Sequence, residues 1–467
     1  MTTTSAPRGS TPPTAAALVR QPYRAATIGL LLVITVVAFE AMAVATAMPR
    51  AVAALHGLAY YAWPFTAFLV ANVVGIVTGG EWADRDGPRR PLLAGLAIFT
   101  VGLLLAGLAP TMAVFVAGRT VQGLGSGLVI VAVYVVIAEV YDERLRPRMF
   151  AALSAAWVLP SLIGPVVSGA LTQHLTWRLV FLTIPPFIVV GLALIRSALR
   201  GLPEHHRDPA AGRLGRWRFA LLAAAGIAVM QYAGQHLRWW SLALLAAGVL
   251  LLAPALRVLL PAGTLRVRRG LPAVVAFRGI VAGSFFAVDS YVPLTLTDLH
   301  HYGATAAGLP LMLGALGWSA GSWWQGRRPD VPRHRIIRVG FALVAVAALG
   351  MTLLTVPHLP GWIAYPTWMV GGTGMGLVMP SLSILLLEMS PVAERGQNSA
   401  ALQICDVMTS AVCIGLGGVL VAAAEHGALS LRTAVGAIDV SMAVFALAGV
   451  TLAGRAAVRR GVGVTAG

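Results

Sequence analysis

The stretch GGEWADRDGPRR, from Gly79 to Arg90, is a short charged segment between two long apolar runs. It begins in the last residues of the run 62–82 and ends at the first residue of the run 90–109. Each run has about the 20 residues that a helix needs to cross the hydrocarbon core of a bilayer. Glycines on both sides of the charges permit a tight turn. The segment therefore predicts a charged loop at a membrane surface.

The composition of the whole chain agrees with this interpretation. The 467 residues are 58% hydrophobic and 11% charged, and the mean hydropathy is +0.81. A soluble domain carries about a quarter charged residues, so lipid must be the solvent for most of this chain. The formal net charge is +17, and every basic residue is Arg. These arginines lie mostly in short loops and form no continuous basic face, which argues against nucleic-acid binding.

Apolar runs of 18 or more residues recur along the chain, separated by Gly, Pro and Arg. They predict an all-α integral membrane protein with 14 transmembrane helices: 25–48, 62–82, 90–109, 112–140, 147–172, 177–198, 217–236, 239–260, 271–296, 304–325, 334–356, 361–387, 397–423 and 431–454. Only the sequence QHLRWW separates 217–236 from 239–260, so a single long kinked segment is the alternative there.

The arginines indicate which side of the membrane each loop faces. With the N-terminus inside, the outer loops and helix ends hold only Arg50, Arg178, Arg238 and Arg432. Arg119 and Arg278 lie within predicted spans, and the remaining 28 arginines fall on the cytoplasmic side. Basic loops stay inside, so the bias predicts a multi-pass protein of the cytoplasmic membrane with both termini cytoplasmic. Removing one of the two central spans would invert every later loop.

An internal repeat supports the same count. An offset of 249 residues aligns Gly123, Gly125 and Gly127 with glycines 372, 374 and 376, and it places Glu40 on Asp289. Repeated halves with a substrate site between them are common in secondary transporters. The predicted divisions are a disordered cytoplasmic tail 1–24, a six-helix half 25–198, cytoplasmic loops with two extra peripheral helices 199–270, a six-helix half 271–455 and a cytoplasmic tail 456–467.

The loop GGEWADRDGPRR resembles the signature loop of the major facilitator superfamily, in which glycine precedes Asp-Arg and then glycine and a basic pair. The matching positions are Gly80, Asp84, Arg85, Gly87, Arg89 and Arg90; Trp82 and Pro88 depart from the pattern. The resemblance implies a cytoplasmic latch that stabilises the outward-facing state. Glu139, at the inner end of the fourth span, is the expected partner of its arginines.

Three further segments resemble motifs of this superfamily. GRTVQGLGSGL, from Gly118 to Leu128, resembles the fourth-helix motif, whose arginine (here Arg119) is implicated in proton coupling. IGPVVSG resembles the exporter motif through Gly164, Pro165 and Gly169. FEAMAVATAMP, which holds Glu40, resembles the first-helix motif of the fourteen-helix drug:proton antiporter (EmrB/QacA-like) family. TWRLVFLTIPP is similar to the sixth-helix entry of that family.

Acidic residues well inside apolar runs are the candidate functional groups: Glu40, Asp289, Asp406 and Asp439. A buried carboxylate without a fixed cation can exchange protons near neutral pH. Our hypothesis is that Glu40 and Asp289 face each other from the two halves as the proton and substrate-charge site. Arg119 would tune Glu40, and Asp406 is the next candidate.

Aromatic side chains, among them Trp157, Tyr291 and Trp63, would line a cavity suited to lipophilic cations. The expected function is therefore proton-coupled export of amphiphilic or cationic drugs by a monomer embedded in lipid. Its partners would be protons and a small-molecule substrate, and it would need no cofactor beyond the proton gradient.

Two alternatives stay open: an exporter of one metabolite or lipid, and a membrane receptor or scaffold that transports nothing. No nucleophile–base arrangement or metal-ligand cluster stands out, so an enzyme is not expected. The histidine pairs 205–206 and 300–301 lie in loops. Cys405 and Cys413 are about 12 Å apart along one predicted helix, too far for a disulfide.

Overall fold

The computed structural model describes Leu18 and residues 23–201, 215–236, 240–328, 330–391 and 394–456, and these residues form helices and connecting turns without a strand. The helices of the first part of the chain are α1 (Arg24–Ala54), η2 (Leu58–Tyr60), α2 (Trp63–Asp86), α3 (Arg89–Gly107), α4 (Met112–Val140), α5 (Arg146–His174), α6 (Leu179–Leu182) and α7 (Ile184–Arg200). Those of the second part are α8 (Arg216–Gln235), α9 (Ser241–Leu259), η3 (Thr264–Arg266), α10 (Leu271–Asp298), α11 (Ala304–Gly326), α12 (Arg333–Met351), η4 (Thr352–Thr355), η5 (Gly361–Ile363), α13 (Ala364–Met389), α14 (Arg395–Glu425), α15 (Leu431–Leu452) and η7 (Ala453–Ala456).

Within the described residues, 12 helical segments are long and apolar enough to cross a membrane. The protein is therefore a multi-pass membrane protein. Of the 14 predicted spans, α8 and α11 are not in this set, although they have 20 and 23 residues. Their glycines, tryptophans and amides lower the hydropathy of segments that have sufficient length.

Two helix boundaries differ from the sequence prediction because of proline. Helix α1 continues through Pro49 to Ala54, although the predicted span ends at residue 48. Proline is tolerated inside membrane helices where neighbouring groups satisfy the backbone. The predicted span 177–198 divides instead into α6 and α7 at Thr183. Pro185 and Pro186 follow, and neither has an N–H with which to continue the hydrogen-bond ladder of α6.

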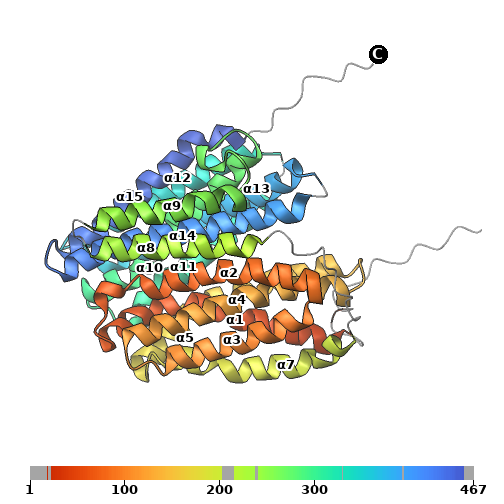
Figure 1. Ribbon diagram of the computed structural model, residues 1–467. Helices are drawn as coiled ribbons and strands as arrows, with labels where there is room; N and C mark the ends of the chain where they lie inside the picture. Colours follow the sequence, from red (N-terminus) through yellow and green to blue (C-terminus); the bar gives the residue numbers. More distant parts are fainter. Residues whose placement is uncertain are drawn as a thin grey trace, which may run out of the picture.

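The N-terminal helices (α1–α7) and the C-terminal helices (α10–α15) repeat one packing scheme. In the first set α1 packs against α5, and α4 packs against both α2 and α3. In the second set α10 packs against α14, and α13 packs against both α11 and α12. Figure 1 shows the two sets as neighbouring layers of the bundle, with red-to-yellow helices below the cyan-to-blue ones.

The two sets contact each other through α5 with α11 and through α2 with α14. The close contacts lie at the end of the bundle where α1 ends and α2 begins, which we call the α1–α2 end. There Tyr61 stacks on Tyr291 with ring centroids 5.4 Å apart and donates a hydrogen bond to the Ser290 carbonyl. The opposite end, where α2 gives way to α3 at Gly87, is called the α2–α3 end.

Two glycines permit this approach. A Cβ on Gly169 of α5 would lie 2.6 Å from Cα of Thr305, at the start of α11. A Cβ on Gly418 of α14 would lie 2.3 Å from Cβ of Ala62, just before α2. Both distances are too short for real atoms, so side chains at these positions would separate the two sets.

Helices α8 and α9 pack against each other, but only α9 is peripheral. Leu242 and Leu250 of α9 are 74% and 73% exposed, as expected for a lipid-facing helix. Helix α8 instead packs against both α2 and α14, so it lies across the boundary between the two sets. The expectation that both extra helices are peripheral is wrong for α8, because its glutamines bond to α2 and the preceding turn.

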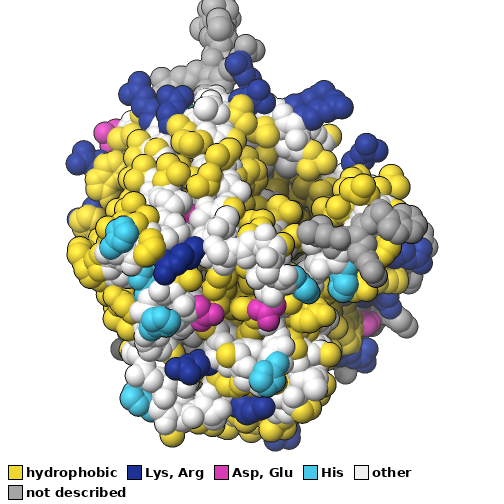
Figure 2. All heavy atoms as spheres, turned by 90° about the vertical axis from the view of Figure 1, so that its left-hand side faces the viewer, with side chains coloured by type: hydrophobic (Ala, Val, Ile, Leu, Met, Phe, Trp, Pro, Cys, Tyr) yellow, Lys and Arg dark blue, Asp and Glu magenta, His cyan; other side chains and the backbone are white. Residues whose placement is uncertain are grey.

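Figure 2 views the bundle along its helices, from the left-hand side of Figure 1, and shows histidine (cyan), arginine (dark blue) and acidic (magenta) side chains among hydrophobic ones (yellow) at that end. Both cysteines are buried and free. The predicted tails at residues 1–17, 19–22 and 457–467, the histidine pair 205–206 and Arg238 lie outside the described residues.

Candidate functional site

The first candidate site joins Glu40 of α1 to Arg119 of α4. Arg119 Nη1 donates to Glu40 Oε1, and both side chains are almost completely buried. The same nitrogen donates to Oε1 of Gln122 at 2.9 Å, and Nε donates to the Pro64 carbonyl at 3.1 Å. The guanidinium lies 4.3 Å from the ring centroid of Phe68. The sequence hypothesis that Arg119 acts on Glu40 therefore has a geometric basis in direct contact.

This arrangement favours a charged pair. An isolated buried carboxylate is costly, but a guanidinium that also satisfies a backbone carbonyl and an aromatic face offsets the cost. One oxygen, Glu40 Oε2, is buried without a hydrogen-bond partner among the described residues. The carboxylate thus keeps one free acceptor on a side chain that is otherwise held in place.

The second candidate site joins Asp289 of α10 to Trp368 of α13. Trp368 Nε1 donates to Asp289 Oδ1 at 2.7 Å. The indole is 1% exposed and stacks on Phe285, with centroids 4.6 Å apart and planes 16° apart. A neutral donor holds this acid, and Asp289 has no ion-pair partner within the described part of the chain.

The two sites occupy equivalent positions in the repeat. The offset of 249 that relates Glu40 to Asp289 also relates Arg119 to Trp368. In each set, the acid on the first helix therefore receives a hydrogen bond from the equivalent position of the fourth helix. The donor is a guanidinium in the N-terminal set and an indole in the C-terminal set. Sequence reasoning missed the bond from Trp368 to Asp289, although the offset contained the signal.

A third acid also has a cation. Arg278 Nε of α10 donates to Asp406 Oδ2 of α14 at 2.8 Å, and Arg278 Nη1 donates to the Met379 carbonyl at 3.4 Å. The two side chains remain 17% and 13% exposed, unlike the sealed pair of Glu40 and Arg119. Asp406, the next candidate from sequence, is therefore in an ion pair whose partner lies 128 residues away in the chain.

Asp439 of α15, the last of the intramembrane acids, lies apart from these sites. It is 2% exposed, and its Oδ2 has no hydrogen-bond partner among the described residues. Helix α15 packs mainly against α12, with further contacts to α10 and α14. Glu40, Asp289 and Asp406 are thus each held by a named donor.

The signature loop forms the turn that was expected. Gly80 lies in the last turns of α2, and a Cβ there would meet only Val131 at 4.0 Å. Gly87 ends α2 with φ of 76°, a conformation that favours glycine. The backbone therefore favours glycine at Gly87, whereas Gly80 has room for a side chain.

The charged residues of the loop differ in their contacts. Asp84 and Arg85 have no ion pair or hydrogen bond to another described residue, whereas Arg90 pairs with Asp86 at 3.9 Å. Glu139 lies in the last turn of α4. Arg89 is exposed at the start of α3. The latch between this loop and Glu139 stays a prediction.

The exporter-like segment of α5 lies between α1 and α11. A Cβ on Gly164 would meet Met42 of α1 at 3.4 Å, and Ser168 donates to the Ala43 carbonyl at 2.6 Å. The Pro165 carbonyl lies 3.0 Å from the Cβ position of Gly308 of α11. Together with Gly169, the segment packs the N-terminal set against the C-terminal set.

The aromatic residues predicted to line a cavity are spread through the protein. Tyr291 is 1% exposed and donates to the Ile414 carbonyl at 2.7 Å, so it belongs to the contact at the α1–α2 end. Trp63 donates from Nε1 to Gln235 of α8 at 2.6 Å. Trp157 is half-buried on α5. Their contact with substrate stays a prediction.

A hydrogen-bonded cluster outside the spans secures the start of α1. Tyr23 donates to Asp142 at 3.0 Å and stacks on Tyr141 at 5.2 Å. The Tyr141 and Thr27 hydroxyls are 2.8 Å apart. The hydrogen bond to Asp142, together with burial and the charge of that carboxylate, raises the pKa of Tyr23. Burial raises the pKa of Tyr141.

A membrane bundle of two similarly packed helix sets, with acids at matching positions inside the helices, defines a transporter-like protein. The family model described as Major Facilitator Superfamily matches residues 30–414. The chain belongs to the major facilitator superfamily, and this membership and its relatives indicate a transporter and not an enzyme.

Among its relatives, a protein of Mycobacterium tuberculosis named "Probable multidrug-efflux transporter" is 28% identical over 424 residues, covering 86% of this chain and 88% of the relative. "Multidrug resistance protein 3" of Bacillus subtilis is 24% identical over 310 residues, covering 62% and 59%. A crystal structure of a POT family transporter superposes with a TM-score of 0.69 at 15% identity, covering 91% of this chain and 95% of that one. That likeness shows the fold alone.

Proposed function

We propose that this protein is a proton-coupled antiporter that exports amphiphilic or cationic compounds from the cytoplasm by alternating access. The observation that carries the proposal is the contrast between Glu40, paired with Arg119, and Asp289, bonded only to Trp368. An acid without a cation can bind either a proton or a substrate cation, and this mutual exclusion couples the two fluxes.

The surroundings of Asp289 suit a flat, lipophilic cation. Phe285 and Trp368 stack beside the carboxylate, and Trp318 lies edge-on to Phe285 at 6.2 Å. Aromatic faces attract cations and accept planar apolar groups. The relatives named for multidrug efflux support an amphiphilic drug over a single metabolite.

The membrane topology is part of the proposal. Helices α8 and α11 would cross the bilayer with the other 12 segments, giving the arrangement of the fourteen-helix drug:proton antiporters with both termini in the cytoplasm. The packing of α11 between α5 and α13 supports its inclusion. The contacts at the α1–α2 end would then close the extracellular side, leaving the site accessible from the cytoplasm.

The test is transport of a fluorescent lipophilic cation in proteoliposomes under an imposed pH gradient. We expect gradient-driven transport by the native protein and its loss in Asp289→Asn and in Glu40→Gln. Asp439→Asn is the matched control, because it also changes a buried acid of the membrane region but lies apart from the candidate sites. Full gradient-driven transport by Asp289→Asn would contradict the assigned coupling site.

Absence of transport by the native protein, with the fold intact, would favour an exporter of one metabolite or lipid. Proton release from the purified protein on addition of a candidate substrate would still identify a coupled carrier. A protein that neither transports nor releases protons with any compound of a broad panel would favour the receptor or scaffold alternative.

A further inference from the structure

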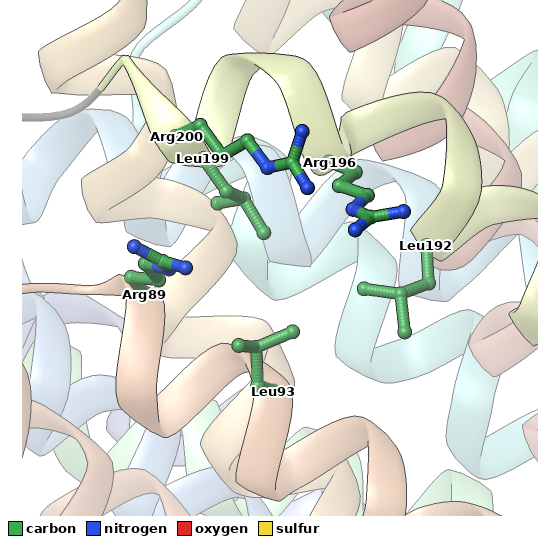
Figure 3. A pocket seen from close by; sticks show the side chains of 6 residues that line it. All are labelled: Arg89, Leu93, Leu192, Arg196, Leu199 and Arg200. Atoms are coloured by element: carbon green, nitrogen blue, oxygen red, sulfur yellow. The ribbon is translucent and has the colours of Figure 1, made fainter.

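A hollow of about 230 Å³ lies between the start of α3 and the end of α7, at the α2–α3 end of the N-terminal helices. Figure 3 shows side chains from both helices extending toward this space. Its lining consists of three arginines and three leucines: Arg89, Arg196, Arg200, Leu93, Leu192 and Leu199. The site lies on a different part of the protein from the intramembrane acids.

The three arginines carry positive charge that the described protein does not neutralise. Arg89, Arg196 and Arg200 are exposed, and none forms an ion pair or hydrogen bond with another described residue. By contrast, neighbouring Arg90 pairs with Asp86. Guanidinium groups bind phosphate oxygens in a planar, bidentate manner. Three of them around one hollow are suited to a phosphate group.

The leucines specify what must be attached to that phosphate. Leu199 is 3% exposed, and Leu93 and Leu192 are half-buried. Farther along α7, the side chains of Phe187, Val189 and Val190 are 53%, 65% and 51% exposed on a helix that crosses the membrane. The apolar surface thus continues from the hollow along the lipid-facing side of α7. A free phosphate would contact the arginines but leave this surface uncovered.

We propose that the hollow binds the headgroup of an anionic phospholipid, with its phosphate on Arg89, Arg196 and Arg200 and its acyl chains along α7. Basic hollows between helices at the membrane surface are suited to such headgroups. The lipid bridges α3, which begins in the signature loop, to α7, the last helix of the N-terminal set. This site is independent of which substrate the protein transports.

The test compares lipid binding by the full-length protein in phosphatidylcholine nanodiscs, with phosphatidylglycerol added in steps and binding followed by native mass spectrometry. The native protein should retain phosphatidylglycerol in preference to phosphatidylcholine. The double variant Arg196→Gln with Arg200→Gln should bind phosphatidylglycerol more weakly. We expect the affinity to fall about fivefold for each arginine removed. Both side chains are exposed and form no ion pair or hydrogen bond with another described residue, so the variant is expected to fold.

The matched control is Arg257→Gln with Arg266→Gln, which removes two exposed arginines, one in the last turn of α9 and one in η3, that do not line the hollow. This control should bind phosphatidylglycerol as the native protein does. Equal affinity in the hollow variant and the native protein would overturn the proposal, as would an equal loss in the control. Competition by inorganic phosphate or glycerol phosphate at the same concentration as the lipid would show a site for a soluble anion and would also overturn it.

Discussion

The N-terminal and C-terminal helices place an acid at the same position but surround it differently. Glu40 is sealed against Arg119, which also bonds to a backbone carbonyl and lies over an aromatic ring. Asp289 receives one hydrogen bond from an indole. A fixed cation stabilises a carboxylate in one charge state, whereas a neutral donor allows two. Under the proposed function, the pair of Glu40 and Arg119 holds one charge state and Asp289 is the exchangeable site.

The comparison extends to the contact between the sets. Gly169 and Gly418 are also related by the offset of 249, and each receives the start of a helix from the opposite set. Around Gly169 the nearest atoms are backbone atoms of Ala304 and Thr305, whereas around Gly418 the nearest is a single side-chain carbon of Ala62. An added side chain at Gly169 would therefore have to displace backbone, whereas one at Gly418 would have to displace a single methyl group.

The largest effect is expected when the ion pair of the N-terminal helices is broken. Arg119→Leu leaves Glu40 buried without a cation, and removing one partner of a buried pair costs about 3–5 kcal/mol. Unfolding of the detergent-solubilised protein measures the loss. The double variant Glu40→Gln with Arg119→Leu should recover part of it, because no uncompensated charge remains. If Arg119→Leu were as stable as the native protein, Glu40 would not depend on Arg119 as its cation.

A smaller loss is expected in the C-terminal helices. Trp368→Phe removes the hydrogen bond to Asp289, and bonds to charged groups contribute about 1.5–3 kcal/mol. The same substitution made together with Asp289→Asn should cost less, because the acceptor is then neutral. A double-mutant cycle of unfolding free energies gives this coupling. A coupling near zero would show that Trp368 acts by packing alone.

The glycine pair offers a comparison of two equivalent substitutions. Gly169→Ala should open the α1–α2 end more than Gly418→Ala, with overpacking costs of about 1–3 kcal/mol. Spin-label distances between α2 and α14 and between α5 and α11 measure the opening. Ala62→Gly should restore the closed distance in Gly418→Ala, because it removes the atom that clashes. Failure of that rescue would assign the effect to another contact.

The smallest effect is expected at Tyr23, whose hydrogen bond to Asp142 links the start of α1 to the loop after α4. In the C-terminal set the positions equivalent to Tyr23 and Asp142 are Pro272 and Pro391, which cannot form this bond. The raised pKa of Tyr23 means that its contribution is present below its unfolded value of about 10 and is lost as the pH rises further. Thermal stability of the native protein should fall slightly more than that of Tyr23→Phe between pH 9 and about pH 11, by no more than about 1 kcal/mol. Parallel curves would show that the hydroxyl contributes nothing.

Much of the fold follows from local sequence. Long apolar runs, the turn at Gly87 and the repeat of 249 residues predict the helices and their approximate ends. The break between α6 and α7 could not be predicted from hydropathy alone, because it depends on how the backbone accommodates two consecutive prolines. The apolar runs alone do not separate α8 and α11 from the more hydrophobic spans.

The candidate site was less accessible to sequence reasoning. The intramembrane acids and Arg119 stand out because charge is costly in lipid. Their partners do not stand out, since Trp368 is 79 residues and Arg278 is 128 residues from the acid it contacts. An indole has no charge to draw attention among 12 tryptophans. Only alignment of the two repeats relates it to Arg119.

Helix α8 packs against both α2 and α14, which would move apart if the two helix sets separated at this boundary. Gln231 accepts a hydrogen bond from Thr66 at 2.6 Å, and Gln235 bonds to Trp63 and to the Ala59 carbonyl, so polar contacts fasten α8 to the α2 side. Toward α14 it offers close apolar contact, with Gly234 against Val419. Separation of α2 from α14 would break the apolar contacts before the hydrogen bonds. A rigid molecule bound between α8 and α14 would therefore fix the distance between these two helices. It would inhibit the proposed alternating-access cycle without entering the substrate path.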